Sequence, residues 1–169
     1  MIIQAEQQHT ALIVPLMAAF RRELRALKGA QTGEDLACAR EEFLDCLGRG
    51  WTMYCYLAEG VALGYALCRV EGGIVWCEHL YVQPDHRRQG IASALFRQAE
   101  ALAASLGESM VYNWVHPNNQ AIIAFLKKQG YDVLNLIELR KAQPDEQLIP
   151  GFVVGENSYK YWLAGRPMA

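Results

Sequence analysis

A loop reading Gln83-Pro84-Asp85-His86-Arg87-Arg88-Gln89-Gly90-Ile91-Ala92 follows the apolar run of residues 74–82 and leads into a helical pattern. The free N–H groups at the start of a helix point outward together, and the helix dipole favours negative charge there. Gly90 has no Cβ to keep a ligand away from the backbone. Arg87 and Arg88 add positive charge that suits phosphate oxygens. The loop is therefore predicted to bind a pyrophosphate, although neither GxxxxGK[ST] nor GxGxxG occurs in the chain.

The segments before and after this loop have different hydrophobic periods. Before it, residues 52–58, 61–70 and 74–82 favour strands joined by glycine-containing turns, which predicts an antiparallel meander. After it, apolar residues recur at spacings of three and four over residues 91–106, which predicts a helix closed by Gly107. The loop therefore connects the last strand of the meander to this helix.

The rest of the chain completes a mixed α/β pattern. Helices are predicted at residues 10–28, 36–47 and 117–128, strands at 110–115 and 133–139, and a hairpin at 152–162. No internal repeat or domain-sized linker is visible in the sequence. We therefore expect a single α/β (α+β) domain over residues 1–169, with a mixed, mostly antiparallel twisted sheet flanked by helices.

Composition limits the class of protein. Fifty-two per cent of the 169 residues are hydrophobic and 20% are charged, as in an ordinary globular protein with a sizeable core. Sixteen Lys and Arg against 18 Asp and Glu give a net charge of -2, which argues against a broadly basic nucleic-acid surface. No apolar run approaches the roughly 20 residues of a membrane span, and no secretory signal is visible. The expectation is a soluble cytoplasmic domain with neither a nucleic-acid nor a membrane partner.

The spacing of cysteine and histidine does not match a metal site. The five cysteines form no CxxC pair and their number is odd, so buried reduced cysteine is expected in the predicted strands. The four histidines have no ligand spacing among themselves or with the cysteines. No metal site is predicted.

Two blocks of sequence resemble one protein family. Arg87, Gly90 and Ala92 occupy the fixed positions of the acetyl-CoA loop [Q/R]-x-x-G-x-[G/A], and residues 115–131 match the second block in register. The chain thus resembles the GCN5-related N-acetyltransferase (GNAT) superfamily. The resemblance is strongest over residues 51–140. The part before it agrees only in element order, and residues 141–169 are interpreted as a C-terminal extension with a strand or hairpin.

The resemblance implies acetyl-CoA as co-substrate and a set of residues that bind it. The backbone of Leu80 and Val82 would pair with the pantetheine amides like a neighbouring strand. Asn119 falls where the family often has a pantetheine-binding Asn, although it could equally cap the helix that begins there. The pyrophosphate would be held by the backbone from Arg88 to Ser93 and supported by the Arg87 and Arg88 side chains, which gives the set Arg87, Arg88, Gln89, Gly90, Ile91, Ala92 and Ser93.

Acetyl transfer to an amine needs a base, because only the neutral amine attacks. The family often places this base on the strand before the loop. By the two-residue period, Glu78 would share a face there with Trp76, Leu80 and Val82. Glu78 is therefore the predicted base, directly or through water. The alternative interpretation is a Glu paired with a neighbouring Arg or Lys, and His79 would point to the opposite face as a structural histidine.

One family residue is missing. Leu126 stands where a Tyr commonly protonates the departing thiolate. Tyr131 is our candidate replacement, with Tyr112 and Tyr81 as alternatives. A thiol with an ordinary pKa of about 8.5 is a tolerable leaving group without an acid, so transfer remains feasible.

The sequence thus predicts an acetyl-CoA-dependent N-acetyltransferase. It would transfer an acetyl group to a primary amine of a small molecule or peptide by direct attack in a ternary complex. The main alternative is an acyl-CoA-binding protein of the same fold with little or no transferase activity. A longer acyl group or an oxygen acceptor is a third possibility. The aromatic C-terminal segment could complete the sheet or contact a second copy, and a homodimer is expected by family resemblance only.

Overall fold

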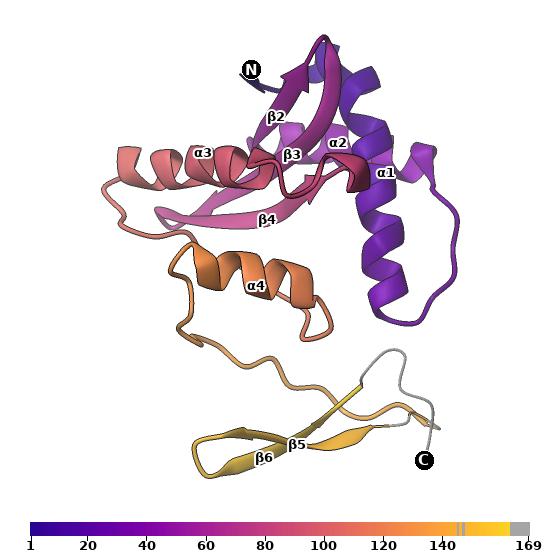
Figure 1. Cartoon of the computed structure of the whole chain (residues 1–169), viewed down its shortest axis with the longest axis vertical. Coiled ribbons are helices and arrows are strands. Elements are labelled where there is room, and N and C mark those ends of the chain that lie inside the picture. The colour runs from indigo at the N-terminus through magenta and orange to yellow at the C-terminus, as the bar shows by residue number, and fades with distance from the viewer. Residues whose placement is uncertain (145, 147, 163–169) are drawn as a thin grey trace. The chain divides into compact units, whose positions relative to one another are not determined.

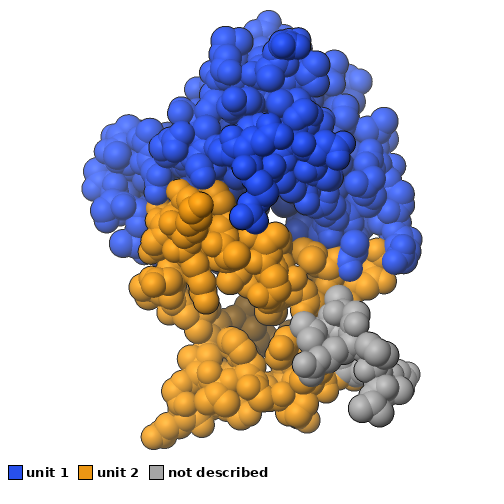
Figure 2. Space-filling view, in the orientation of Figure 1, with its two compact units in different colours: residues 1–26, 31–114 blue, residues 27–30, 115–169 orange. Residues whose placement is uncertain are grey.

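The computed structural model of the chain describes residues 1–144, 146 and 148–162. The chain divides into two compact units, residues 1–26 with 31–114 and residues 27–30 with 115–169 (Figure 2). The expectation of one domain over the whole chain remains a prediction. Within the described residues, no helix is both long and apolar enough to cross a membrane.

The first unit is built on a four-stranded antiparallel sheet in the order β1-β2-β3-β4. The strands are β1 (Ile2–Gln4), β2 (Thr52–Ala58), β3 (Val61–Glu71) and β4 (Ile74–Val82). Gly72 and Gly73 form the turn between β3 and β4, with φ of 59° and 84°. Two-residue hairpin turns need such positive φ values, because their twist then matches that of the strands. The predicted meander is confirmed.

Three helices cover the two faces of this sheet (Figure 1). They are α1 (Thr10–Leu27), α2 (Leu36–Gly48) and α3 (Ile91–Ser105). One face packs against α1 and α2 in a core that includes Met17, Phe20, Phe43, Met53, Tyr65 and Leu67. The other face packs against α3 through Leu63, Ala66, Val82, Ile91 and Leu95. The alternation of side chains along each strand supplies both cores.

The pairing of β3 with β4 contains a β-bulge at Glu78. Leu67 lies opposite His79, whereas the next residue of β3, Cys68, lies opposite Cys77. One extra residue on β4 therefore stands between the two pairs, and that residue is Glu78. A bulge of this kind bends the strand and re-aims side chains.

The bulge changes which side chains share a face. Trp76 lies opposite Arg69. Arg69 is two residues beyond Leu67 and so lies on the face covered by α1 and α2. Leu80 and Val82, by contrast, pack on the α3 side. The prediction that Trp76 and Glu78 share a face with Leu80 and Val82 is wrong, because a two-residue period does not run through a bulge.

Two predicted strands are not formed. Residues 110–115 contain only an isolated parallel bridge between Tyr112 and Trp76 of β4. Residues 133–139 form no strand, and Val133 and Leu139 are 86% and 65% exposed. β-propensity largely reflects packing on a half-buried sheet, so an exposed segment does not realise it.

The second unit holds α4 (Gln120–Lys128) and a hairpin of β5 (Ile149–Val154) and β6 (Asn157–Tyr161). The predicted helix begins later than expected: Asn119 is its N-cap, and Pro117 lies outside it rather than in its first turn. The hairpin is confirmed, with its first strand starting at Ile149.

Candidate active site

The loop after β4 ends in an open helix start. A short 3-10 turn, η2 (Pro84–His86), leads through Arg88, whose φ is 64°, to Gly90 with φ of 84° as the N-cap of α3. Among the described residues other than Gly90, its chain neighbours and the nearby backbone of its own helix, no heavy atom lies within 4 Å of the place where a Cβ on Gly90 would stand. Gly90 has no side chain to cap the first amides of α3, and these have no intrahelical partners. The geometry fits an anion held by backbone N–H groups.

The backbone of Leu80 and Val82 points to the edge of β4 away from β3. Gln83 N–H donates to the Leu63 carbonyl at 2.9 Å. Because bonded pairs alternate along an antiparallel ladder, the backbone of Tyr81 then faces β3 and its two neighbours face outward. The orientation that the predicted pantetheine contacts require is present at both residues.

Arg87 is bound within the protein itself. Its Nε donates to the Val82 carbonyl at 2.8 Å, and its Nη2 donates to both carboxylate oxygens of Glu23 at 2.8 Å. The guanidinium also lies 5.6 Å from the Tyr81 ring centroid. These contacts tie the loop to β4 and α1, which indicates a positioning role for Arg87. Arg88 is exposed and has no ion-pair partner among the residues that the structure describes, so its charge is the one available to a ligand.

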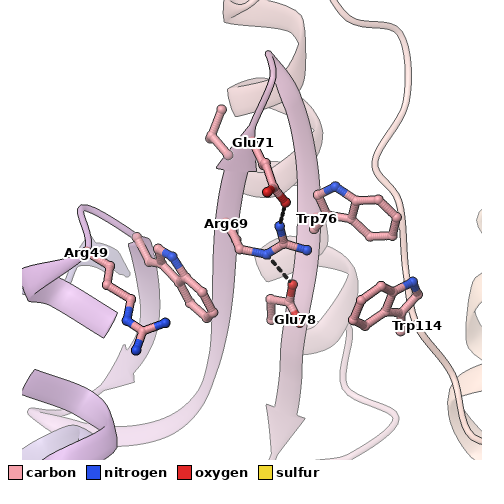
Figure 3. A pocket seen from close by; sticks show the side chains of 8 residues that line it. Arg49, Arg69, Glu71, Trp76, Glu78 and Trp114 are labelled. Atoms are coloured by element: carbon pink, nitrogen blue, oxygen red, sulfur yellow. Dashed lines mark hydrogen bonds and ion pairs between the residues drawn. The ribbon is translucent and has the colours of Figure 1, made fainter. Parts of the chain in front are cut away.

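A pocket of about 610 Å³ opens next to the bulge at Glu78 (Figure 3). It is lined by Arg49, Trp51, Arg69, Val70, Glu71, Trp76, Glu78 and Trp114, all from the first unit. At its centre, Arg69 Nε donates to Glu78 Oε1 at 2.7 Å, and the same guanidinium pairs with Glu71. The hydrogen bond that Arg69 donates to Glu78 is the main reason that the pKa of Arg69 is raised.

Indole rings surround the Arg69 guanidinium. Its Cζ lies 6.0, 5.4 and 5.9 Å from the ring centroids of Trp51, Trp76 and Trp114. The last two rings are 5.2 Å apart and inclined at 62°. Distances within about 6 Å allow cation–π attraction, so the aromatic side chains hold Arg69 in place beside Glu78.

Glu78 is therefore paired with a neighbouring arginine, as the alternative interpretation of this residue predicted. Its side chain is 18% exposed and that of Arg69 is 16% exposed, so the pair is only partly shielded from water. An ion pair does not prevent a role as base, because Arg69 binds one carboxylate oxygen and leaves the other for a ligand. The role of Glu78 as base stays a prediction.

His79 is a buried structural residue, as predicted, but because of the bulge it shares a face of the sheet with Trp76 rather than lying on the opposite one. Its Nε2 lies 3.2 Å from Arg21 Nη2, and its Nδ1 lies 3.0 Å from Tyr65 Oη. A guanidinium can only donate, so Nε2 accepts and the proton is assigned to Nδ1. Burial, followed by the charge of Arg21, lowers the pKa of His79 well below its ordinary value. The ring packs 4.5 Å from that of Phe20 and therefore faces α1.

Three predicted site positions lie in the second unit. Asn119 Oδ1 accepts the Ile122 N–H at 3.3 Å and so caps α4. Leu126 is buried, and its carbonyl accepts the Tyr131 N–H at 3.0 Å. The cap uses the Oδ1 atom of Asn119. The predicted roles of Asn119 and Tyr131 at the acetyl-CoA site remain predictions.

Sequence reasoning missed most of the pocket. Arg49, Trp51, Arg69, Glu71 and Trp114 were not predicted site residues. One signal for Arg69 was available: the Gly72-Gly73 turn sets the pairing of Arg69 with Trp76. Trp114 carried no comparable signal, because it follows an isolated bridge rather than a strand.

The chain belongs to the acetyltransferase (GNAT) family, whose sequence model matches residues 17–131. The expected family and fold class are therefore confirmed. A curated relative, an uncharacterized N-acetyltransferase from Methanocaldococcus jannaschii, is 28% identical over 94 residues. This match covers 44% of the present chain and 42% of the relative, so the chain spans about two fifths of the relative's length.

Solved structures show the same fold at low sequence identity. A probable acetyltransferase has a TM-score of 0.68 at 18% identity, covering 87% of this chain and 99% of its own. The protein AAC(6')-Iy, solved with the bisubstrate analogue CoA-S-monomethyl-acetylneamine, has a TM-score of 0.66 at 19% identity, covering 85% and 98%. At these identities the likeness establishes the fold.

Proposed function

We propose that this chain is an acetyl-CoA-dependent N-acetyltransferase that acetylates a primary amine of a small molecule or peptide by direct attack in a ternary complex. One observation carries the proposal. Glu78 lines the pocket, and the outward-facing backbone of β4 begins two residues later at Leu80. The pocket, which we assign to the amine acceptor, and the free edge of β4, which we assign to the acetyl-CoA donor, therefore lie next to each other at the bulge.

The residues at the loop fit acetyl-CoA. The N–H groups from Gly90 to Ser93 and the Arg88 side chain would hold the pyrophosphate, and Leu80 and Val82 would pair with the pantetheine arm. The Val82 carbonyl is already bonded to Arg87, so its N–H is the group left for this contact. When bound, acetyl-CoA supplies the acetyl group as a thioester. The CoA-containing analogue in the similar AAC(6')-Iy structure supports this assignment.

Glu78 would prepare the acceptor. An alkylamine is mostly protonated near neutral pH, and only its neutral form attacks a carbonyl carbon. Arg69 binds Oε1 of Glu78, so we assign Oε2 as the oxygen that takes the ammonium proton, directly or through water. Arg69 then acts as a positioning residue that fixes the direction of the carboxylate.

An acid for the departing thiolate is not essential to this scheme. Leu126 has no proton to give. Tyr131 remains our proposed substitute, and an ordinary thiol pKa of about 8.5 lets the thiolate leave slowly without it. A cytoplasmic location and a homodimer are further proposals that rest on the sequence and the family resemblance.

An amine panel with acetyl-CoA tests the function. Release of free CoA in the presence of amino acids, polyamines, aminosugars, arylalkylamines or peptide N-termini would support transfer, with mass spectrometry of the product as confirmation. A thermal shift with acetyl-CoA, but no CoA release with any amine, would favour the binding protein without transferase activity. No thermal shift with acetyl-CoA would overturn the acetyl-CoA site itself.

A further inference from the structure

We propose that the pocket around Arg69 selects a primary amine with one positive charge and a flat apolar ring, the chemistry of an arylalkylamine. This inference rests on the proposed function, because it takes the pocket as the acceptor site. Three properties of the pocket carry it: its indole surfaces, its balance of charge and its size.

Indole surfaces make up much of the pocket wall. Three of the eight lining residues are Trp. Trp114 is 68% exposed, and its ring lies edge-to-face with Trp76 at 5.2 Å. Figure 3 shows both rings on the same side of Arg69. A flat ring that stacks on the exposed indole would gain contact area that a sugar or a linear chain lacks.

The charges in the pocket favour a single cation. Arg49 pairs with Asp45 at 2.8 Å and is thereby balanced. Two carboxylates, Glu71 and Glu78, then face the one guanidinium of Arg69, which leaves one negative charge in excess. One ammonium group restores neutrality, and the indole faces attract it further. A polyamine or an aminosugar with several positive charges would exceed the single negative charge that the pocket has in excess.

An anionic acceptor is disfavoured by the same arrangement. Both arginines that line the pocket are engaged by carboxylates of the chain. A phosphate or carboxylate on the acceptor would have to displace Glu71, Glu78 or Asp45. It would also approach the negative charge that the pocket holds in excess.

The dimensions suit a small molecule with one ring. A volume of about 610 Å³ lies within the range of small-molecule sites, roughly 300–1,000 Å³. Glu78 is 18% exposed, whereas Glu71 is 73% exposed. The shielded carboxylate marks the inner end of the pocket, so the amine would point to Glu78 while the ring lies against Trp114.

Intrinsic tryptophan fluorescence tests the preference independently of turnover. The protein, with CoA bound, is titrated with 2-phenylethylamine, n-butylamine, 2-phenylethanol, phenylalanine and spermidine. The expected result is that 2-phenylethylamine binds about tenfold more tightly than butylamine, which lacks the ring, or 2-phenylethanol, which lacks the charge. Equal or tighter binding of spermidine or phenylalanine would overturn the proposal.

Variants locate the effect in the pocket. Trp114→Ala is expected to weaken binding of 2-phenylethylamine about fivefold, and Trp114→Phe to recover part of the loss. Val61→Ala is the control, because Val61 is a comparably exposed apolar residue at the opposite end of β3. Trp114 is exposed, so its removal leaves the core intact. Unchanged affinity in Trp114→Ala would contradict the assignment.

The amine panel separates this inference from the proposed function. If the protein releases CoA with an aminosugar or polyamine but not with arylalkylamines, the transferase stands and the acceptor class is wrong. If none of the amines in the panel leads to release of CoA, the proposed transferase activity is wrong. Fluorescence binding of 2-phenylethylamine would then still report whether the pocket recognises this class.

Discussion

Glu23 of α1 and Arg87 of the loop are joined by two hydrogen bonds of 2.8 Å, although 64 positions separate them in sequence. Arg87 also bonds the Val82 carbonyl at the end of β4. One guanidinium therefore links a helix, the loop and a strand. Because the loop presents the start of α3, the position of the first amides of this helix depends on a carboxylate in a different part of the chain.

Glu23→Gln is expected to weaken acetyl-CoA binding with little effect on chemistry. The amide cannot replace the two charged hydrogen bonds to Arg87, so the loop is held less firmly. The pair is partly exposed, at 42% and 36%, so the effect is modest: about fivefold in the KM for acetyl-CoA, or ~1 kcal/mol. Steady-state kinetics at a saturating amine concentration measure KM and kcat separately, and kcat should change less than KM.

The matched control is Glu34→Gln. Glu34 pairs with Arg22, the neighbouring arginine of α1, at 2.6 Å and with similar exposure of 43% and 36%. This pair is not connected to the loop, so its loss should leave the KM for acetyl-CoA unchanged. Equal increases in both variants would show that Glu23 acts only on the stability of α1.

Glu78→Gln is expected to reduce kcat by about a hundredfold or more, the usual contribution of a general base. The glutamine keeps the size of the side chain and can still accept a bond from Arg69, but it cannot take the ammonium proton. Steady-state kinetics at saturating acetyl-CoA and amine concentrations measure this loss of kcat.

Glu71→Gln provides the comparison for Glu78. Glu71 also pairs with Arg69, but it is 73% exposed and lies at the β3–β4 turn, away from the bulge. Its replacement is expected to raise the KM of the amine while kcat changes little. A large loss of kcat in Glu71→Gln, with a normal kcat in Glu78→Gln, would reverse the assignment.

The loop and its neighbouring elements could be predicted because their signals are local. Gly90 before an apolar helical stripe marks a helix start, and a Gly72-Gly73 pair between strand-like runs marks a hairpin. Both features depend on a few adjacent residues. Their confirmation gives the meander, α3 and the open start of this helix.

The bulge and the pocket could not be predicted in the same way. The extra residue at Glu78 depends on how β3 and β4 pair, which no local pattern of β4 records. The contacts of Arg69 with Trp51 and Trp114 join distant parts of the sequence. The predicted alternation of side chains along β4 did not allow for the bulge, so Glu78 was assigned to the wrong face of the sheet.

Arg88 allows its charge and its backbone conformation to be tested separately. Its φ of 64° is left-handed, which costs a non-glycine residue about 1 kcal/mol. Arg88→Gly and Arg88→Ala both remove the charge, but only glycine adopts this φ without strain. The glycine variant should exceed the alanine variant in free energy of unfolding by about 1 kcal/mol, measured by urea denaturation.

The two Arg88 variants should nevertheless bind acetyl-CoA with the same reduced affinity. The lost interaction is electrostatic, so the difference from the wild type should shrink as the salt concentration rises. Titration calorimetry at two salt concentrations measures this. If the glycine variant bound as tightly as the wild type, the Arg88 side chain would have no role in holding the pyrophosphate.

Because His79 is buried, we expect the free energy of unfolding to fall below neutral pH. Burial lowers its pKa well below 6.5 in the folded protein, whereas the unfolded chain titrates near the ordinary value. Below pH 6.5 the unfolded state therefore binds more protons. The contribution of neutral His79 to the free energy of unfolding is fully present above pH 6.5. It is lost as the pH falls toward the pKa of the folded state, at up to about 1.4 kcal/mol per pH unit.

His79→Phe isolates this effect, because it keeps a ring against Phe20 but cannot titrate. The variant should be less stable than the wild type at pH 8, since the Tyr65 hydroxyl and Arg21 lose a partner. Its free energy of unfolding should then fall less steeply than that of the wild type between pH 6.5 and 5. Urea denaturation at several pH values gives both curves, and His9→Gln, at a half-buried position, controls for loss of any histidine. Parallel curves for the wild type and His79→Phe would show that His79 contributes nothing to the acid sensitivity of the fold.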